Sequence, residues 1–419
     1  MIFEEKAKSI PITKEMVWAA YKKIRQNGKG AGVDRVSLGD FEQVRNKELY
    51  KIWNRLSSGS YFPPMVKRVL IPKGEGKQRP LGIPTVSDRI AQEVLKNYLE
   101  PRLEVEFLEN SYGYRPRKSA HDAVGKVRQN VRKHPWVIDL DIQAFFENMN
   151  HDLLMKALVK HVKEKGVLMY LKRWLESAIL LEDGSHRHPS GKGTPQGGVI
   201  SPLLSNLYLH YSIDKWLKKY YPEVPMVRYA DDVVIHCRSY KESEEILSRL
   251  KCRLEACKLT AHPEKTKIVY CKKSGRNLKG HPVQFDFLGF SFQPLQIKLK
   301  RGGSFQQFDC KMSRKSKKRI LGTLSELAFH KKSQITIQDL ALMLNPKIRG
   351  WANYYGKISK KSLNPVFYHL HHRIIKWILN KYKGFKGSKI KAVKWLRRII
   401  ISFPNMFYHW QLGYKFVKT

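Results

Sequence analysis

The sequence predicts an α+β protein in which a strand-bearing region is followed by a helical one. Two observations predict this fold class. Short runs of apolar and β-branched residues recur up to about residue 292 and alternate with segments of helical periodicity, whereas after about residue 312 the apolar pattern is mostly helical. A chain of 419 residues, of which 42% are hydrophobic, can bury the cores of about two to four domains.

The strand-bearing region is expected to mix both kinds of element. Runs of apolar and β-branched residues bounded by turn-forming residues predict strands at 66–72, 137–142, 226–229, 233–237, 267–271 and 285–292. Helical periodicity predicts helices at 13–27, 86–100, 119–133, 151–180, 202–218 and 241–257. In the later region it predicts helices at 312–330, 337–344, 347–356, 363–382 and 389–401. Boundaries are expected near residue 36 and near 295–310, where Gly and Pro interrupt the pattern.

The chain carries a large excess of positive charge. It has 79 Lys and Arg against 36 Asp and Glu, a formal charge of +43 and a pI of about 10.0. This charge predicts a polyanionic partner such as nucleic acid, with an acidic protein or a membrane surface as the weaker alternative. No apolar run of transmembrane length and no signal-peptide pattern is present, so a cytoplasmic protein without a membrane partner is expected. The 5 cysteines include no Cys-x-x-Cys pair, which favours buried thiols over a zinc site or a disulfide framework.

Positive charge is concentrated toward the C-terminus. After residue 300 the only acids are Asp309, Glu326 and Asp339, while Lys and Arg continue throughout. Around 381–398 basic residues are mixed with aromatic ones, a combination that pairs with phosphates and stacks on bases, although a solvated basic face is the alternative. The candidates for RNA contact are Arg349, Lys381, Lys383, Lys386, Lys389, Lys391, Lys394, Arg397 and Arg398.

Two adjacent acids, Asp231 and Asp232, lie between two apolar runs that favour β-structure, the pattern of a hairpin whose turn exposes both carboxylates. Two neighbouring anions repel each other, so one would stay protonated unless a divalent cation or a basic partner offsets the repulsion. The alternative is a solvated Asp-Asp turn. A third acid, Asp141, ends another apolar run, with Asp139 as the second choice in that strand. Three acids on two strands can hold two magnesium ions for nucleotidyl transfer, an arrangement that resembles the palm of reverse transcriptases.

Two further segments carry residues suited to a nucleotide. Val69–Pro80 has the pattern of a strand, a Gly-rich turn and a return strand, which places Lys73 and Arg79 where both can meet one triphosphate. An exposed basic hairpin is the alternative. In Gly193–Gly198 the glycines permit close approach of the backbone to a ligand, with Gln196 beside the nucleotide, or else the segment is an ordinary loop and helix cap.

The ordered set of motifs along the chain resembles the group II intron-encoded reverse transcriptases/maturases of bacteria and organelles. The motifs that carry this resemblance are Gly30–Asp34, Ile71–Lys73 with Arg79, Ser111–Pro116, Asp139–Asp141 with Phe145-Phe146, Asn150–Asp152, Gly193–Gly198, Tyr229–Asp232, Phe287–Phe290 and Ile348–Tyr355. The resemblance implies a right-hand polymerase fold, with α+β fingers and palm followed by a helical thumb/maturase domain. Each motif alone is weak, but the ordered set is specific.

The same resemblance assigns roles to residues. It implies that Asp141, Asp231 and Asp232 are catalytic and bind two Mg²⁺ ions together with the backbone carbonyl of Ile142. It further implies that the nucleotide is contacted by Lys73, Arg79, Ile142, Phe146, Pro195 and Gln196. Among these Phe146 is expected to be the gate against a 2′-hydroxyl, and Phe145 is expected to belong to the palm core.

The implied domains are an N-terminal extension at 1–35, fingers and palm at 36–300, a thumb/maturase domain at 301–385 and a short basic DNA-binding tail at 386–419. Within the extension, the loop Asn27–Arg35 is expected to touch template or primer. The chain ends without the Cys- and His-bearing endonuclease domain of many relatives, so second-strand cleavage is not expected.

We therefore expect an RNA-directed DNA polymerase that also binds its intron RNA as a maturase for splicing and retromobility. The expected partners are group II intron RNA, an RNA template with a DNA primer, dNTP and target DNA, and a homodimer is left open. One alternative is a related enzyme recruited to DNA repair or phage defence. Another is a splicing-only maturase, against which the three intact acids argue.

Overall fold

The computed structural model describes residues 11–27, 30–74, 77–271, 280–299, 302–385 and 387–414, and for Asn27, Lys73, Gly74, Lys77 and Lys298 only the backbone. The chain forms two compact units. Unit 1 comprises Met1–Ala123 and Val137–Ile268, and unit 2 comprises Val124–Trp136 and Val269–Thr419. No helix in the described ranges is both long enough and apolar enough to cross a lipid bilayer.

Unit 1 begins with helices packed around one buried helix. The predicted helices α1 (Lys14–Asn27) and α4 (Val86–Glu104) are confirmed and pack against each other, and α4 buries a continuous apolar face. Between them, α2 (Leu38–Gln43) and α3 (Arg45–Ser57) were not predicted. Both are short and highly charged, and α3 is stabilised by burying Leu49, Ile52 and Leu56 against α1 and α4.

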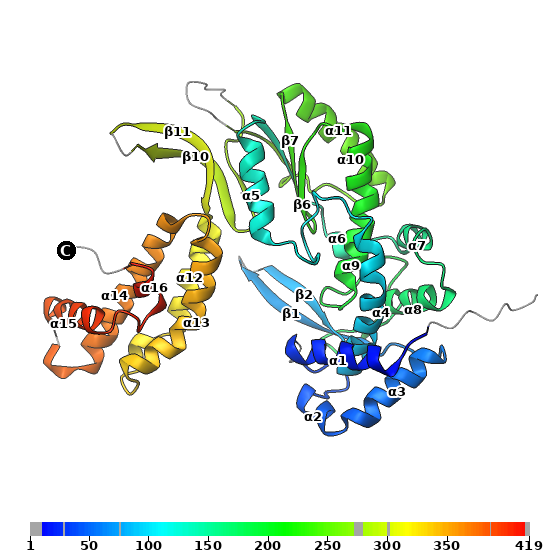
Figure 1. Ribbon diagram of the computed structural model, residues 1–419, viewed down its shortest axis with the longest axis horizontal. Coiled ribbons are helices and arrows are strands. Elements are labelled where there is room, and N and C mark those ends of the chain that lie inside the picture. Colours follow the sequence, from blue (N-terminus) through cyan, green and yellow to red (C-terminus); the bar gives the residue numbers. More distant parts are fainter. Residues whose placement is uncertain are drawn as a thin grey trace, which may run out of the picture. The chain divides into compact units, whose positions relative to one another are not determined.

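A small sheet follows. Strands β1 (Val66–Gly74) and β2 (Lys77–Ile83) form the predicted antiparallel hairpin. β1 also pairs in parallel with β4 (Ile179–Leu180), which pairs with β5 (His186–Arg187), so the order is β2-β1-β4-β5. Figure 1 shows the β1–β2 hairpin extending from the helices of unit 1.

A second sheet has the order β6-β7-β3-β8. Its strands are β3 (Trp136–Leu140), β6 (Met226–Tyr229), β7 (Asp232–Cys237) and β8 (Lys267–Tyr270), each close to its predicted bounds. α11 (Tyr240–Ala256) packs beside β7, as Figure 1 shows. The predicted helix 202–218 is divided into α9 (Ser201–Leu209), a π-helical turn (His210–Asp214) and α10 (Lys215–Tyr220).

The prediction of one helix over 151–180 is wrong. The segment contains α7 (His151–Val159), α8 (Lys165–Leu175) and strand β4. Between the helices, the carboxylate of Glu164 accepts hydrogen bonds of 2.7 Å from Tyr98 and Arg102 of α4. These tertiary contacts hold Glu164 in extended backbone and so override the helical periodicity. The chain also contains α5 (Ala120–Val131), as predicted, and the four-residue α6 (Phe145–Asn148).

Unit 2 contains an antiparallel sheet with the order β11-β10-β9. The prediction of one strand over 285–292 is wrong, because a turn at Leu288 and Gly289, both with positive φ, divides it into β9 (Phe285–Phe287) and β10 (Phe290–Lys298). The third strand, β11 (Ser304–Met312), was not predicted. Phe285 and Phe292 stack with ring centroids 4.8 Å apart. Arg128 at the end of α5 makes a bidentate pair with Asp309 of β11, at 2.6 and 2.8 Å.

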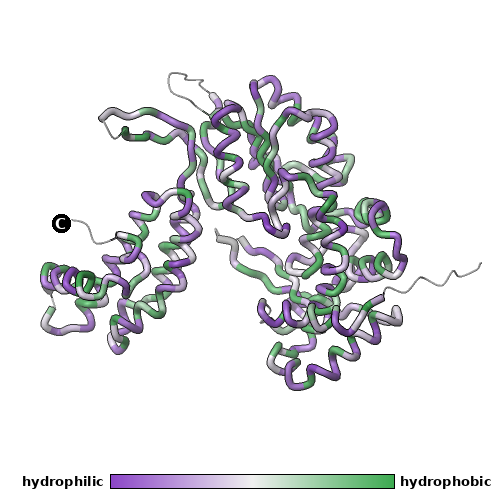
Figure 2. Tube along the Cα trace, viewed as in Figure 1, coloured by the Kyte–Doolittle hydropathy of each residue, from purple (hydrophilic) through white to green (hydrophobic). Residues whose placement is uncertain are grey.

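The helices of unit 2 are α12 (Arg314–Glu326), α13 (Ile337–Tyr355), α14 (Asn364–Lys381), α15 (Lys389–Ser402) and α16 (Tyr408–Gln411). The predicted break between residues 344 and 347 is wrong, because α13 continues through Pro346. Proline removes the hydrogen bond to the carbonyl of Leu342, which water can satisfy because Leu342 is exposed. In Figure 2, hydrophilic and hydrophobic residues alternate along these helices, as expected of helices that bury one face.

The last described helix, α16, packs into unit 2. Trp410 is buried, and its indole N–H donates to Nε2 of His371 on α14 at 3.0 Å. Burial lowers the pKa of His371 to about 4, so the ring is neutral and free to accept this bond at neutral pH. Asn345 of α13 bonds the backbone at both Met406 and Tyr408, at 2.9 Å each. The last helix is therefore part of the core of unit 2.

Candidate active site

Two acids lie at the tip of the β6–β7 hairpin, Asp231 in the turn and Asp232 as the first residue of β7. Tyr229 pairs with Asp232, so Ala230 and Asp231 form a two-residue turn, and Ala230 has a left-handed backbone with φ of 55°. β7 lies beside β3 in the sheet, and Asp141 directly follows β3. The sheet order therefore brings Asp141, Asp231 and Asp232 into one region.

The three acids influence one another electrostatically. The side chain of Asp232 is exposed to solvent, although many protein atoms surround it. Desolvation by these atoms is the largest cause, and repulsion from Asp231 and Asp141 the next; together they raise the pKa of Asp232 to about 6. Nearby positive charges on Arg79 and Lys265 act in the opposite direction. A cation bound between the acids would relieve this repulsion.

A buried ion pair holds the backbone of the β6–β7 turn. Arg228 of β6 is fully buried and makes a bidentate pair with Asp214, at 2.8 and 2.6 Å. It also donates to Asn206 Oδ1 at 2.9 Å and to the carbonyl of Ala230 at 3.1 Å. Although burial opposes it, the guanidinium of Arg228 holds the pKa of Asp214 below its ordinary value. Sequence reasoning missed this pair; its signal was one arginine inside an otherwise apolar strand.

A glycine packs against the same turn. The backbone of Tyr112 donates to the carbonyl of Arg228 at 2.8 Å, and Asn206 donates to the carbonyl of Gly113 at 2.7 Å. A Cβ on Gly113 would overlap the backbone nitrogen of Ala230 and lie 3.0 Å from the carbonyl carbon of Tyr229. Only glycine leaves room for the turn that carries the acids. The resemblance included this motif but gave it no role.

Asp141 is fixed by the segment that precedes β8. Thr266 Oγ1 bonds both the backbone nitrogen and the carbonyl of Asp141, at 3.3 and 3.2 Å, and the backbone of His262 donates to that carbonyl at 2.8 Å. The ammonium of Lys265 lies 3.0 Å from Asp141 Oδ2. The other acid of the strand, Asp139, instead faces Lys267 at 3.8 Å.

The expected nucleotide loop is held against the β1–β2 hairpin. Gly82 of β2 donates its backbone N–H to the carbonyl of Gln196 at 2.6 Å. A Cβ on Gly82 would lie 2.8 Å from Cβ of Pro195, and one on Gly197, whose φ is 112°, would overlap the carbonyl of Gly82. The glycines of this loop therefore serve close backbone packing between loop and hairpin.

A buried polar chain supports this loop from α4. Gln92 accepts from the backbone N–H of Val199 at 2.8 Å and donates to Asp88 at 2.9 Å. Asp88 also accepts from Tyr61 at 3.0 Å and Trp174 at 2.7 Å, and burial raises its pKa to about 6. Sequence reasoning missed Asp88 and Gln92, whose signal was two polar residues four apart, and therefore on one face, of a predicted helix.

The gate candidate is joined to the same loop. Phe146 is half-buried on α6, and its carbonyl accepts from Thr194 at 2.8 Å. Its neighbour Phe145 is buried and packs against Tyr208, with ring centroids 6.3 Å apart, as expected of a core residue. Ile142, three residues before Phe145, is also buried, and it forms a β-bridge with Ala261.

Of the two basic candidates for the triphosphate, Arg79 is exposed on β2. Its charge lowers the pKa of Asp232, which places it near the acids. The backbone of Lys73 lies in β1, and its side chain lies outside the described residues.

Family comparisons agree with this geometry. The model of the reverse transcriptase (RNA-dependent DNA polymerase) family matches residues 71–292, and the model of the group II intron maturase-specific domain matches residues 317–395. The chain belongs to the group II intron-encoded reverse transcriptases/maturases. The predicted family, right-hand polymerase fold and RNA-directed DNA polymerase activity are thereby confirmed.

Individual relatives match most of the length of this chain. The group II intron-encoded protein LtrA of Lactococcus lactis is 26% identical over 474 residues, which cover 91% of this chain and 75% of LtrA. The protein YkfC of Escherichia coli K12 is 34% identical over 299 residues, covering 61% of this chain and 77% of YkfC. An uncharacterised 91 kDa protein in the cob intron of Schizosaccharomyces pombe is 25% identical, covering 92% and 55% of the two chains.

The metal ligands expected for this reverse transcriptase fit by chemistry. Carboxylate oxygens are the donors that Mg²⁺ prefers. Desolvation contributes most to the raised pKa of Asp232, and the repulsion from Asp231 and Asp141 that adds to it is what a divalent cation offsets. In the described part of the chain, no three His, Cys, Asp or Glu side chains lie close enough together to hold a metal ion as they are placed.

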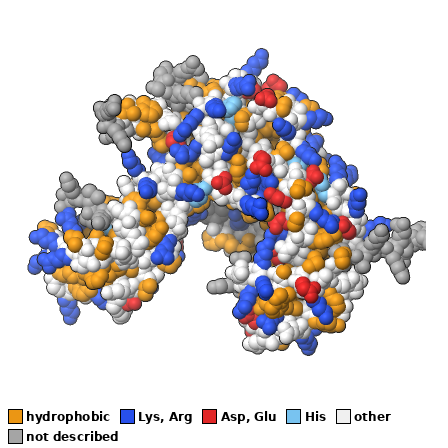
Figure 3. Space-filling view, viewed as in Figure 1, with side chains coloured by type: hydrophobic (Ala, Val, Ile, Leu, Met, Phe, Trp, Pro, Cys, Tyr) orange, Lys and Arg blue, Asp and Glu red, His pale blue; other side chains and the backbone are white. Residues whose placement is uncertain are grey.

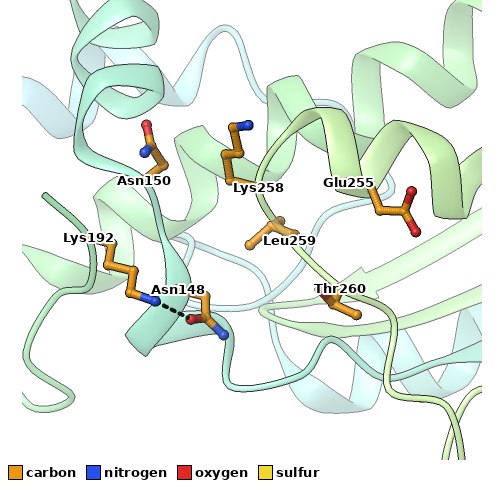
Figure 4. A pocket seen from close by; sticks show the side chains of 7 residues that line it. All are labelled: Asn148, Asn150, Lys192, Glu255, Lys258, Leu259 and Thr260. Carbon is orange, nitrogen blue, oxygen red and sulfur yellow. Dashed lines mark hydrogen bonds between the residues drawn. The ribbon is translucent and has the colours of Figure 1, made fainter.

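A pocket of about 400 Å³ opens beside α6 and the segment that follows α11 (Figure 4). It is lined by Asn148, Asn150, Lys192, Glu255, Lys258, Leu259 and Thr260. Lys192 donates to Asn148 at 3.5 Å, and the carbonyl of Thr260 accepts from the backbone of Gln143 at 2.9 Å. The pocket thus shares its walls with α6 and with the segment leading into Gly193–Gly198.

The candidate RNA-binding residues differ in their placement. Lys391, Lys394 and Arg398 are exposed along one face of α15, opposite buried Ala392 and Leu396. Lys383 and Lys389 are exposed and Arg397 is half-buried, whereas Lys386 lies outside the described residues. Figure 3 shows Lys and Arg side chains over the end of unit 2 that carries α14 and α15, with few acidic ones.

Two other candidates already have partners within the protein. The ammonium of Lys381 donates to the carbonyl of Ser333 at 2.8 Å, so it helps to hold α14 against the segment that precedes α13. Arg349 is exposed, with its guanidinium 5.3 Å from the ring centre of Tyr408.

The loop of the N-terminal extension is described in part. Residues 28 and 29 lie outside the described residues. Farther along, Arg89 donates to the carbonyl of Gly30, and a Cβ on Gly32 would lie 2.7 Å from the backbone of Thr85. This part of the loop therefore packs closely on the start of α4.

The close approach at Gly113 yields a prediction. Gly113→Ala forces the turn at Ala230 to move, and we expect it to reduce the rate of primer extension at least tenfold, because small displacements of reacting groups are costly. Gly125→Ala is the matched control, since a Cβ there has open space within 4 Å, and it should extend at the normal rate. Equal extension rates for the two variants, measured with RNA template and dNTPs, would refute the proposed role of Gly113.

Proposed function

We propose that Asp141, Asp231 and Asp232 hold two Mg²⁺ ions for RNA-templated DNA synthesis, with the backbone carbonyl of Ile142 as an additional ligand. The observation that carries this proposal is the sheet order, which brings the three acids into one region. There desolvation and, after it, repulsion from Asp231 and Asp141 raise the pKa of Asp232 to about 6. When bound, the ions activate the primer 3′-hydroxyl and stabilise the pyrophosphate leaving group.

The chain's own residues would position the nucleotide around these acids. Arg79 would pair its planar guanidinium with the triphosphate, and Lys73 on the paired strand would add a point charge. Pro195 and Gln196 would border the nucleotide, because their loop is bonded to β2 and to α6. Phe146 would lie beneath the sugar.

The exposed basic face of α15 would bind RNA through its phosphates. Lys391, Lys394 and Arg398 follow helical spacing and therefore face the same direction, so they can follow one strand of a duplex or a folded RNA. Lys383, Lys389, Arg397 and Arg349 would extend this surface, while Lys381 is already bonded within the protein.

Group II intron RNA is the ligand we propose for this surface. The segment from residue 386 onward, which includes α15, would also contact target DNA. The maturase-specific match over 317–395 supports this assignment. An RNA template paired with a DNA primer and a dNTP would occupy the region between residues 36 and 300, and 301–385 would act as the thumb. The loop Asn27–Arg35 would touch template or primer.

The metal assignment predicts the behaviour of a single variant. Asp231→Asn removes one ligand charge and should reduce primer extension at least a thousandfold, about 4 kcal/mol of transition-state stabilisation. RNA affinity should stay nearly normal, since the phosphate contacts lie elsewhere. Asp152→Asn, at an exposed position of α7, is the control and should extend normally. Extension by Asp231→Asn at the rate of this control would exclude the metal role.

The gate assignment predicts altered sugar discrimination. Phe146→Val should open space for a 2′-hydroxyl and admit ribonucleotides, so that the preference for dNTP falls by more than the 1–3 kcal/mol, roughly, that one methylene supplies. Phe145→Val is the matched control, because Phe145 is buried and should lower both incorporation rates in parallel. Single-nucleotide incorporation of rNTP and dNTP distinguishes the two. A constant rNTP to dNTP ratio in Phe146→Val would rule out the gate.

The RNA surface predicts a change in salt dependence. Replacing Lys391, Lys394 and Arg398 together by Gln should weaken binding of structured RNA and reduce the slope of log K against log salt by about one unit for each phosphate that is no longer neutralised. The control replaces Lys218, Lys219 and Lys241, which are exposed on unit 1, and removes the same charge. Filter-binding titrations that show the same slope change in both triple variants would contradict a localised surface.

A further inference from the structure

One basic side chain already occupies the cation position beside the proposed metal ligands. The ammonium of Lys265 lies 3.0 Å from Asp141 Oδ2. Its charge also acts on Asp232, whose pKa it lowers. Lys265 therefore interacts with an acid on each of the two strands that carry the site.

The backbone holds Lys265 at this position. On one side of it, the carbonyl of Asp141 accepts from the backbone of His262 at 2.8 Å. On the other side, Thr266 Oγ1 bonds Asp141 at 3.3 and 3.2 Å. The side chain itself is 55% exposed, so its four-carbon stem can swing away into solvent without disturbing this backbone register.

We propose that Lys265 is a stand-in cation. It neutralises Asp141 while no divalent metal is bound, and a metal must displace it in order to bind. The proposal rests on the proposed function, because it takes Asp141 as a metal ligand. A carboxylate oxygen binds Mg²⁺ at about 2.1 Å, and an ammonium held on that same oxygen blocks the approach. The metal and the lysine therefore compete for Asp141.

Competition has two opposite consequences. Without metal, Lys265 offsets the repulsion among the acids and so stabilises the folded chain. With metal, the energy of breaking the ion pair is subtracted from the metal's binding energy. Loss of Lys265 should therefore lower stability in the metal-free protein and strengthen metal binding.

A neighbouring lysine separates competition from a general charge effect. Any lysine near the site repels a divalent cation through its field, so removal of any of them raises affinity somewhat. Lys267 lies two residues farther along and faces Asp139 at 3.8 Å rather than a proposed ligand. Lys267→Gln removes the same charge from nearly the same place without releasing Asp141.

The test is a titration of the full chain with Mn²⁺, without nucleic acid or nucleotide, followed by the free-ion signal in electron paramagnetic resonance. We expect Lys265→Gln to bind Mn²⁺ about twofold to fivefold more tightly than the unaltered chain, the range of an exposed ion pair. The charge-retaining Lys265→Arg should bind with unchanged affinity, and Lys267→Gln, which changes only the field at the site, should gain less than Lys265→Gln. Equal or weaker binding by Lys265→Gln, or equal gains in Lys265→Gln and Lys267→Gln, would overturn the proposal.

Two further variants identify which premise fails. In an Asp141→Asn background, Lys265→Gln should no longer change Mn²⁺ affinity, because the contested oxygen is gone. If Asp231→Asn binds Mn²⁺ as well as the unaltered chain, the proposed metal site is wrong. If Asp231→Asn loses binding but Lys265→Gln has no effect, the site stands and the stand-in cation is wrong.

Thermal unfolding supplies an independent readout. In chelator, Lys265→Gln should unfold at a lower temperature than Lys267→Gln, and saturating Mn²⁺ should reduce this difference. A difference that is the same with and without Mn²⁺ would mean that Lys265 has only a structural role, which contradicts the proposal.

Discussion

The geometry of the β6–β7 turn depends on the buried ion pair between Arg228 and Asp214. Both side chains are fully buried, and Arg228 also donates to the carbonyl of Ala230, the residue with left-handed backbone at the turn. Removing one member of such a pair typically costs roughly 3–5 kcal/mol, because the other charge stays buried without compensation. Asp231 can therefore lie at a sharp, half-buried turn, because the buried guanidinium of Arg228 holds the carbonyl of Ala230.

The rest of the site is held by backbone hydrogen bonds, to which the side chains of Thr266 and Gln92 add. Thr194 bonds the carbonyl of Phe146, Gly82 bonds that of Gln196, and His262 bonds that of Asp141. Phe146, the Gly193–Gly198 loop and Asp141 are thus each fixed through their backbones, so that their side chains can vary without moving the frame. The glycines are required where two of these backbones meet.

The sequence predicted the residues whose chemistry is visible in a short window. Adjacent acids between two apolar runs identified the hairpin, and the strand before Asp141 was predicted close to its true bounds. The partners of buried polar groups were not predictable, because Arg228 and Gln92 find theirs 14 and 107 residues away. The break at Glu164 and the continuation of α13 through Pro346 likewise depend on tertiary packing and solvent, which local periodicity does not contain.

The central claim, that Asp141, Asp231 and Asp232 hold the metal ions, is tested most directly by iron-directed cleavage. Fe²⁺ in place of Mg²⁺, with peroxide and ascorbate, generates hydroxyl radicals that cut the backbone beside the bound ion. The account predicts fragments that end near residues 139–142 and 229–232, and their disappearance when excess Mg²⁺ is added. Fragments that end elsewhere, or cuts at these positions that Mg²⁺ does not suppress, would contradict it.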